Sequence, residues 1–208
     1  MLKYLLLFIL SFNSFALELK DTTYRVLNEQ ILPEDNIKKN QGTAVGIDLS
    51  KFGYMGKHYL LTAGHVVKHK DTIKETPYVE IKGKLHKCRV EKINEESDIC
   101  LLFSKEELPF EVELSDQLHF EGLEEFILFG YPKGKERVKI DGLLLQFDTF
   151  FWVAKVENFN RGFSGGPVFY KDKVLGIIVA GLLKEDDTIH PEYAFFLPLL
   201  RIYQFLAE

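Results

Sequence analysis

A serine flanked by glycines stands in the second half of the chain. Residues 162–167 read G-F-S-G-G-P, and the apolar run V-F-Y follows them. Glycines on both sides of Ser164 let the backbone turn sharply, and such a turn can bring amide N–H groups close to a reacting carbonyl group. The same residues are also compatible with a glycine-rich hairpin turn that carries an incidental serine. A functional turn here would suit nucleophilic attack by the Ser164 hydroxyl.

The G-x-S-x-G pattern also matches the nucleophile elbow of the α/β-hydrolases. Two features of the sequence oppose that fold. An elbow serine is followed by a helix, whereas β-branched and aromatic residues follow Pro167. An α/β-hydrolase also needs a histidine after the serine, and only His190, beside a proline in a charged loop, comes after it.

A histidine suited to proton transfer lies upstream of the serine. His65 follows an apolar run within the segment T-A-G-H-V-V of residues 62–67. Imidazole titrates near neutral pH, so it can take a hydroxyl proton and return it to a leaving amine. His69 lies four residues further on, but Val66 occupies the position where a zinc-binding helix of this spacing needs a glutamate. With no third ligand evident, we expect no metal site.

An aspartate at the start of an apolar strand completes the set. Asp98 stands in the segment S-D-I-C-L-L of residues 97–102, where it could simply end the preceding turn. It could also fix the tautomer and orientation of His65 and stabilise the imidazolium. His65, Asp98 and Ser164 therefore follow one another along the chain, each at an expected strand end or turn.

Short runs rich in Val, Ile, Leu, Phe and Tyr surround these residues. Gly, Pro, Asn, Asp and Lys-Gly turns separate the runs, which is an all-β pattern. With about six runs in each half, we expect two six-stranded antiparallel β-barrels and a short amphipathic C-terminal helix over 199–207. The expected strands are 42–47, 58–62, 78–81, 86–93 and 99–103 in the first half, and 126–129, 138–140, 143–151, 152–156, 168–170, 174–180 and 194–197 in the second. The expected divisions are a signal peptide (1–16), an N-terminal extension (17–39), a first β-barrel (40–105), an inter-barrel linker (106–119) and a second β-barrel with the helix (120–208).

The composition is that of a globular domain with an export signal. The 208 residues are 46% hydrophobic and 27% charged, and a net charge of −5 without a long basic run argues against a nucleic-acid partner. Lys3, an apolar run over 4–10 and the small residues Ser14 and Ala16 have the order of a secretory signal. A membrane anchor is the alternative, but spanning needs about 20 apolar residues, and polar residues interrupt this run early. We therefore expect a soluble periplasmic or secreted protein with no membrane contact after signal cleavage.

Export permits a disulfide bond between the two cysteines. Cys88 and Cys100 each lie six residues from Asn94, at the polar tip of an expected hairpin, so they could face each other across the strands. A bridge would staple the hairpin, and two small buried thiols are an equally good interpretation. Neither cysteine has the electropositive, partly exposed setting that a nucleophilic thiolate needs.

In its motifs the sequence resembles a chymotrypsin-fold (trypsin-like) serine endopeptidase, and it is most similar to the bacterial HtrA/Deg-type protease domain. The resemblance rests on T-A-G-H-V-V, S-D-I-C-L-L and N-R-G-F-S-G-G-P in this order, with V-L-G-I following, and spans about residue 40 to the C-terminus. It implies two β-barrels with the catalytic cleft between them, His65 and Asp98 coming from the first and Ser164 from the second. It also implies an oxyanion hole formed by the Gly162 and Ser164 amides, polypeptide substrates, and no cofactor or metal.

The chain departs from that family's pattern at two places. Phe163 stands where HtrA proteases usually have Asn and where digestive members have an Asp that pairs with a freed N-terminus, so that activation route has no counterpart. The sequence also ends soon after the closing helix, so we expect no PDZ domain. Phe163 suggests the alternative of a catalytically inactive or effector-dependent module that binds extended peptides. An esterase using the same residues is a remoter alternative.

The resemblance also implies where a peptide would bind. Substrate would lie along Ile178, Val179 and Ala180, beside the pocket for P1, the residue whose carbonyl group is attacked. Asn158 stands where trypsin-like members keep an Asp, and Ile177 replaces the histidine of glutamate-specific relatives. We therefore expect a modest preference for apolar P1 residues in an exported serine endopeptidase.

Overall fold

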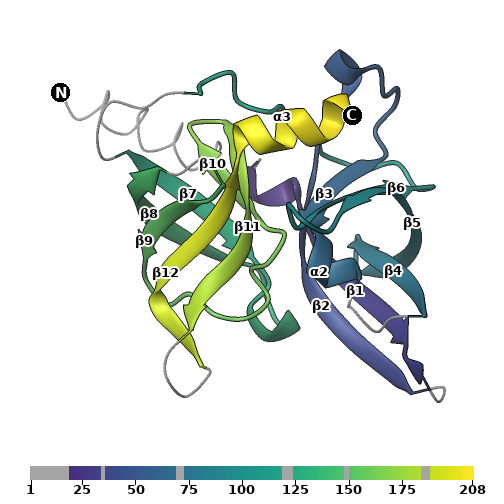
Figure 1. The fold of residues 1–208 in the computed structure, drawn as a ribbon. Coiled ribbons are helices and arrows are strands. Elements are labelled where there is room, and N and C mark those ends of the chain that lie inside the picture. The colour runs from purple at the N-terminus through teal and green to yellow at the C-terminus, as the bar shows by residue number, and fades with distance from the viewer. Residues whose placement is uncertain (1–18, 34–35, 69–72, 119–123, 148–149, 184–187) are drawn as a thin grey trace, which may run out of the picture.

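The computed structural model describes residues 19–208 except 34–35, 69–72, 119–123, 148–149 and 184–187. The predicted signal peptide, residues 1–16, lies outside the described residues. The chain forms two closed six-stranded antiparallel barrels that lie side by side (Figure 1). The prediction of an all-β double barrel with a short C-terminal helix is therefore confirmed. Within the described residues, no helix has the length and apolar character needed to cross a membrane.

The first barrel has the strand order β1-β2-β3-β6-β5-β4. All of its neighbouring strands are antiparallel, and a short helix follows β3. Its elements are β1 (Thr23–Ile31), β2 (Ile37–Gly46), the 3-10 turn η2 (Ser50–Phe52), β3 (Tyr59–Ala63), α2 (Gly64–Val67), β4 (Lys74–Ile81), β5 (Lys84–Asn94) and β6 (Ile99–Ser104).

The predicted N-terminal extension over 17–39 is wrong, because β1 and the start of β2 lie within it. The reason lies in the inward-facing positions of β1. Asn28 and Gln30 are fully buried, and both side chains donate hydrogen bonds to the Val67 carbonyl oxygen. Because polar residues stand where a barrel strand normally has apolar ones, β1 lacks the alternation that identifies a strand in a sequence.

The second barrel has the strand order β10-β11-β12-β9-β8-β7. Its elements are β7 (Glu125–Gly130), η3 (Pro132–Gly134), β8 (Val138–Phe147), β9 (Trp152–Val156), β10 (Pro167–Tyr170), β11 (Lys173–Leu183), β12 (Ile189–Pro198) and the helix α3 (Leu199–Ala207).

The predicted strands 138–140 and 143–151 differ from the structure, because a single strand, β8, runs through the predicted break. Gly142 is not a turn residue. A Cβ atom placed there would lie 2.5 Å from Cε2 of Phe126, so this glycine makes room for a ring of the barrel core.

The two barrels are packed into one body by the connection between them and by α3. Residues 105–118 run along the junction, where Val112 bridges to Ile47 of the first barrel and Leu114 to Val174 of the second. Helix α3 follows the last strand of the second barrel and runs toward the first barrel (Figure 1). Its apolar side chains are buried in the cluster that fills the first barrel and the junction. Those side chains are Leu199, Ile202, Phe205 and Leu206.

The two cysteines are free, buried thiols, so the disulfide alternative is wrong. Asn94 pairs with Ile99 at the hairpin turn, which places the centre of symmetry beyond Asn94, and a bulge in β5 shifts the register further. Cys88 is therefore opposite Ser104, and Cys100 is opposite Ile93. Burial raises the pKa of Cys88 to about 12 and also raises the pKa of Cys100.

Candidate active site

The His65 ring is held by Asp98. β3 and β6 are hydrogen-bonded neighbours, and His65 follows the end of β3 just where Asp98 precedes the start of β6. Oδ2 of Asp98 lies 2.8 Å from Nδ1 of His65, and Oδ1 accepts the His65 backbone N–H at 2.7 Å. This carboxylate fixes the ring orientation and leaves Nε2 as the nitrogen that can accept a proton. The His65 side chain is 46% exposed, so a substrate can reach it.

The backbone of this pair is compact because of two special residues. Asp98 adopts a left-handed conformation with φ 53°, which Asp tolerates better than most residues. Its carbonyl oxygen accepts the Gly64 N–H at 3.0 Å. A Cβ atom at Gly64 would lie 3.2 Å from Oδ1 of Asp98, so a larger residue would crowd the carboxylate that orients His65.

Three amide side chains that sequence reasoning missed support the end of α2. Asn28 and Gln30 bind the Val67 carbonyl oxygen, and Nδ2 of Asn40 donates to the His65 carbonyl oxygen at 3.1 Å. They satisfy carbonyl groups that a helix of a single turn cannot satisfy itself. For Asn28 and Gln30 the one sequence signal is the presence of amides at the inward-facing positions of β1, which only the register of the strand makes visible, whereas Asn40 lies on β2.

The turn formed by residues 162–166, called here the serine turn, packs on β2 of the first barrel. The Thr43 backbone N–H donates to the Ser164 carbonyl oxygen at 2.8 Å, and Oγ1 of Thr43 donates to the Gly162 carbonyl oxygen at 2.7 Å. A Cβ atom at Gly42 would lie 2.6 Å from the Val66 side chain and 2.8 Å from the Ser164 carbonyl oxygen. The helix that carries His65 and the turn that carries Ser164 therefore meet at the bare backbone of Gly42.

The backbone of the serine turn presents amide groups. The Arg161 carbonyl oxygen accepts the Lys133 N–H at 2.8 Å, and the chain has no cis peptide bond among its described residues. Because a trans peptide directs its C=O and N–H to opposite sides, the Gly162 N–H points away from Lys133. Gly162 adopts φ +105°, a conformation that favours glycine. In the described part of the chain, neither the Gly162 nor the Ser164 amide N–H has a hydrogen-bond acceptor.

The predicted triad is brought together only in part. His65 and Asp98 are joined directly, whereas the described contacts contain no hydrogen bond between the Ser164 hydroxyl and the His65 ring. Catalytic hydrogen bonds are often longer in the absence of substrate. No three His, Cys, Asp or Glu residues in the described ranges are grouped as metal ligands, and His69 lies outside those ranges.

Comparison with known proteins identifies the fold but no family. No protein-family model and no curated protein matches the sequence. Among solved structures, the active form of the Rv3671c protease from M. tuberculosis is similar, with a TM-score of 0.73 and 17% identity over 93% of this chain and 82% of that one. Its inactive form is also similar, with a TM-score of 0.68 and 16% identity over 94% and 92%. The chain has the trypsin-like double-barrel fold.

Within this trypsin-like fold, Phe163 is part of the core of the second barrel. Its side chain is fully buried, and its ring lies 5.2 Å from the Phe159 ring at an interplanar angle of 33°. A Cβ atom at Gly130 would lie 2.4 Å from Cδ1 of Phe163, so the glycine provides the space that the ring occupies. The Phe163 ring therefore anchors the serine turn in the apolar core of the second barrel.

The predicted substrate strand divides into two parts. Ile178 is fully buried. Both of its backbone groups bind the serine turn, because its carbonyl oxygen accepts the Gly165 N–H at 2.6 Å and its N–H donates to the Gly166 carbonyl oxygen at 2.8 Å. Val179 and Ala180 instead line an apolar pocket of about 310 Å³ beside Asp98. The two outer residues thus face the candidate site, and Ile178 positions the turn.

A larger hollow of about 1180 Å³ lies on the second barrel between β7, β8 and β9. Its lining contains none of His65, Asp98 and Ser164. Asn158, which the resemblance placed in the P1 pocket, lines this hollow instead.

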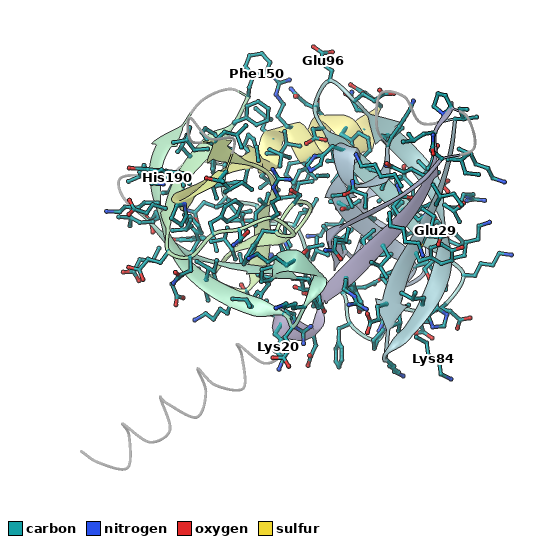
Figure 2. The ribbon with its side chains drawn as sticks, turned by 90° about the horizontal axis from the view of Figure 1, so that it is seen from below. Lys20, Glu29, Lys84, Glu96, Phe150 and His190 are labelled. Atoms are coloured by element: carbon teal, nitrogen blue, oxygen red, sulfur yellow. The ribbon has the colours of Figure 1, made fainter. Side chains whose placement is uncertain are left out.

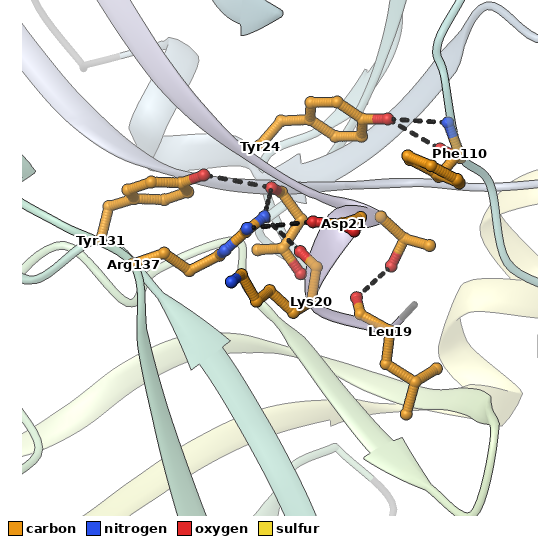
Figure 3. A network of polar contacts seen from close by, with 9 residues as sticks. Leu19, Lys20, Asp21, Tyr24, Phe110, Tyr131 and Arg137 are labelled. Carbon is orange, nitrogen blue, oxygen red and sulfur yellow. Dashed lines mark hydrogen bonds and ion pairs between the residues drawn. The ribbon is translucent and has the colours of Figure 1, made fainter. Parts of the chain in front are cut away.

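The start of the first barrel is tied to the second barrel by a network of polar contacts (Figure 3). Lys20 lies at the junction of the barrels in Figure 2, and its carbonyl oxygen accepts a hydrogen bond from Arg137. The Arg137 guanidinium also binds the Thr23 carbonyl oxygen at 3.0 Å and the Asp21 carboxylate at 3.2 Å. The hydroxyl of Tyr131 donates to the same Thr23 oxygen at 3.2 Å. Residues 20–23 are thereby fixed to the second barrel.

Tyr131 links this contact to the serine turn. Its backbone N–H donates to Oγ1 of Thr43 at 3.1 Å, the same hydroxyl that donates to Gly162. Its carbonyl oxygen lies where a Cβ atom at Gly162 would come within 2.2 Å. The position of Gly162 therefore depends on contacts from both barrels.

Proposed function

We propose that this protein is a serine endopeptidase that hydrolyses peptide bonds through an acyl-enzyme. The observation that carries the proposal is the double contact of Asp98 with His65, through the ring Nδ1 and the backbone N–H, beside the serine turn. An oriented imidazole next to a serine in a glycine-rich turn is the arrangement that activates a hydroxyl group for acyl transfer. The trypsin-like fold, which a protease shares, supports it.

In the proposed reaction, Ser164 Oγ attacks the peptide carbonyl carbon while Nε2 of His65 accepts the hydroxyl proton. The Gly162 and Ser164 N–H groups bind the oxyanion that forms. His65 then donates the proton to the leaving amine, and the C–N bond breaks to give the acyl-enzyme. Water attacks the ester with His65 as the base, which releases the acid and restores Ser164. Asp98 orients the His65 ring and stabilises the imidazolium that forms in each step.

We infer further that the protein is exported after cleavage near residue 16 and acts on polypeptides in the periplasm or the medium. Among trypsin-like proteases, the HtrA/Deg-type domain remains the subfamily that its motifs favour. The alternative of an inactive peptide-binding module was motivated by Phe163. The Phe163 ring is buried in the barrel core, which supports a structural role for this residue. A buried ring does not block the backbone amides of the serine turn that would bind the oxyanion.

The proposal is tested by labelling the purified protein, without residues 1–16, with a fluorophosphonate probe and measuring its intact mass. We expect one covalent adduct in the wild type and none in Ser164→Ala or His65→Ala. Asp98→Asn should keep the fold and label slowly, because a comparable substitution in this chemistry lowers kcat by about 10,000-fold. A wild-type protein with intact circular dichroism and no adduct would refute the proposal.

A further inference from the structure

The edge of β11 beyond the serine turn is open on one side. β10 pairs with β11 only up to Ile177, and Ile178 then binds the turn through Gly165 and Gly166. Among the described strands, residues 179–183 pair with β12 alone. An extended peptide can add to such an edge through backbone hydrogen bonds, with its side chains pointing alternately to opposite faces.

The geometry of attack fixes where the P1 side chain must go. The carbonyl carbon of the P1 residue has to reach Ser164, at the start of this open edge. The P1 side chain is attached to the Cα atom bonded to that carbonyl carbon. It must therefore enter the space between the edge of β11 and the stretch that precedes the serine turn. Gly181 faces that space from β11, because a Cβ atom there would project toward the Phe159 ring.

Phe159 fills the space. A Cβ atom at Gly181 would lie 2.8 Å from Cε1 and 3.2 Å from Cδ1 of Phe159, so the ring rests directly on the strand. On its other side the ring lies 5.2 Å from the Phe163 ring. The Phe159 side chain is only 3% exposed, and its backbone N–H donates to the Pro191 carbonyl oxygen at 2.9 Å. The ring is thus held between the substrate edge and the anchor of the serine turn.

We propose that Phe159 closes the P1 pocket and restricts this protease to substrates with Gly, Ala or Ser at P1. The inference rests on the proposed function, and it narrows the preference for apolar P1 residues expected from the sequence. A leucine or phenylalanine side chain would need the volume that the Phe159 ring already occupies. Phe159 is a specificity-determining residue and takes no part in the chemical steps.

The test compares peptide substrates that differ only at P1. The wild type should cleave after Ala with a kcat/KM at least about 100-fold higher than after Phe, in line with what a pocket discriminates by size. Phe159→Ala should reduce this ratio at least about 10-fold by opening the pocket to larger side chains. Phe159→Leu, which keeps most of the packing, should raise cleavage after Leu or Val if Phe159→Ala does not fold.

Phe126→Ala is the matched control. This residue is also 3% exposed in the core of the second barrel, but its ring contacts Phe196 and not the serine turn. It should lower the thermal unfolding temperature like the Phe159 variants and leave the P1 ranking unchanged. Cleavage after Phe as fast as after Ala by the wild type, or equal P1 ranking in the wild type and both Phe159 variants, would overturn the inference. Failure of the probe to label Ser164 would instead overturn the proposed function on which the inference rests.

Discussion

The contact between Gly130 and Phe163 makes a quantitative prediction about the serine turn. Phe163→Ala removes a fully buried ring, which costs about 3–5 kcal/mol of unfolding free energy. Gly130→Ala places a methyl group 2.4 Å and 2.8 Å from two ring atoms of Phe163, an overpacking that costs about 1–3 kcal/mol. In the double variant the ring is absent, so the added methyl group enters the cavity. The Phe163 Cα atom, 2.9 Å away, remains, so the relief is partial. We expect the loss of unfolding free energy in the double variant to be about 1–2 kcal/mol smaller than the sum of the losses in the two single variants.

Urea unfolding of the four proteins, followed by tryptophan fluorescence, measures this coupling. Trp152 is the single tryptophan, and it packs in the same core cluster as Phe163, so its emission reports on the correct barrel. Gly142→Ala combined with Phe163→Ala is the matched control, because the methyl group at Gly142 would meet Phe126 instead. Its effects should add. Additive effects within about 0.5 kcal/mol for Gly130 and Phe163 as well would refute the assignment of Gly130 as the space for the ring.

Three further predictions follow from single contacts. Thr43→Val removes the hydroxyl that donates to Gly162 and should cost about 1–3 kcal/mol of unfolding free energy and slow probe labelling, whereas Thr43→Ser should preserve both. Burial raises the pKa of Glu111 from 4.5 to about 7, so the folded protein holds a proton that the unfolded chain has lost. The free energy of unfolding should therefore fall as the pH rises from about 4.5 to about 7. Glu111→Gln should flatten this pH dependence, as measured by urea titrations at a series of pH values. Cys88 and Cys100 should react with a thiol reagent only after unfolding, because both are buried with raised pKa values; rapid reaction of the native protein would contradict this.

The residues of the candidate site could be found from the sequence because their signals are local. The glycines around Ser164, the strand before His65 and the apolar run after Asp98 each lie within a few residues of the group they position. The register of β5 and β6 could not be found in this way. It depends on a bulge within β5 and on where the turn begins, so counting residues from Asn94 misplaced the two cysteines.

Other features were missed because they depend on contacts of buried residues with partners that are distant in the sequence. Asn28 and Gln30 look like outward-facing residues of a loop, because their buried partner, the Val67 carbonyl oxygen, is distant in sequence. Phe159 looks like an ordinary core aromatic residue until Gly181 is seen opposite it. Contacts between residues far apart in the chain carry the information in both cases, and hydrophobic periodicity does not contain it.

The docking of α3 on the first barrel has a consequence for the synthesis of the protein. The six strands of the first barrel are complete at Ser104, but the apolar surface that Ile202, Phe205 and Leu206 cover stays exposed until the ribosome has added α3. A nascent chain that has just completed the six strands of this barrel therefore exposes an apolar surface to solvent. We expect folding of the first barrel to finish only when α3, at the end of the second barrel, docks on it. His65 and Ser164 are then brought together only at the last stage of folding.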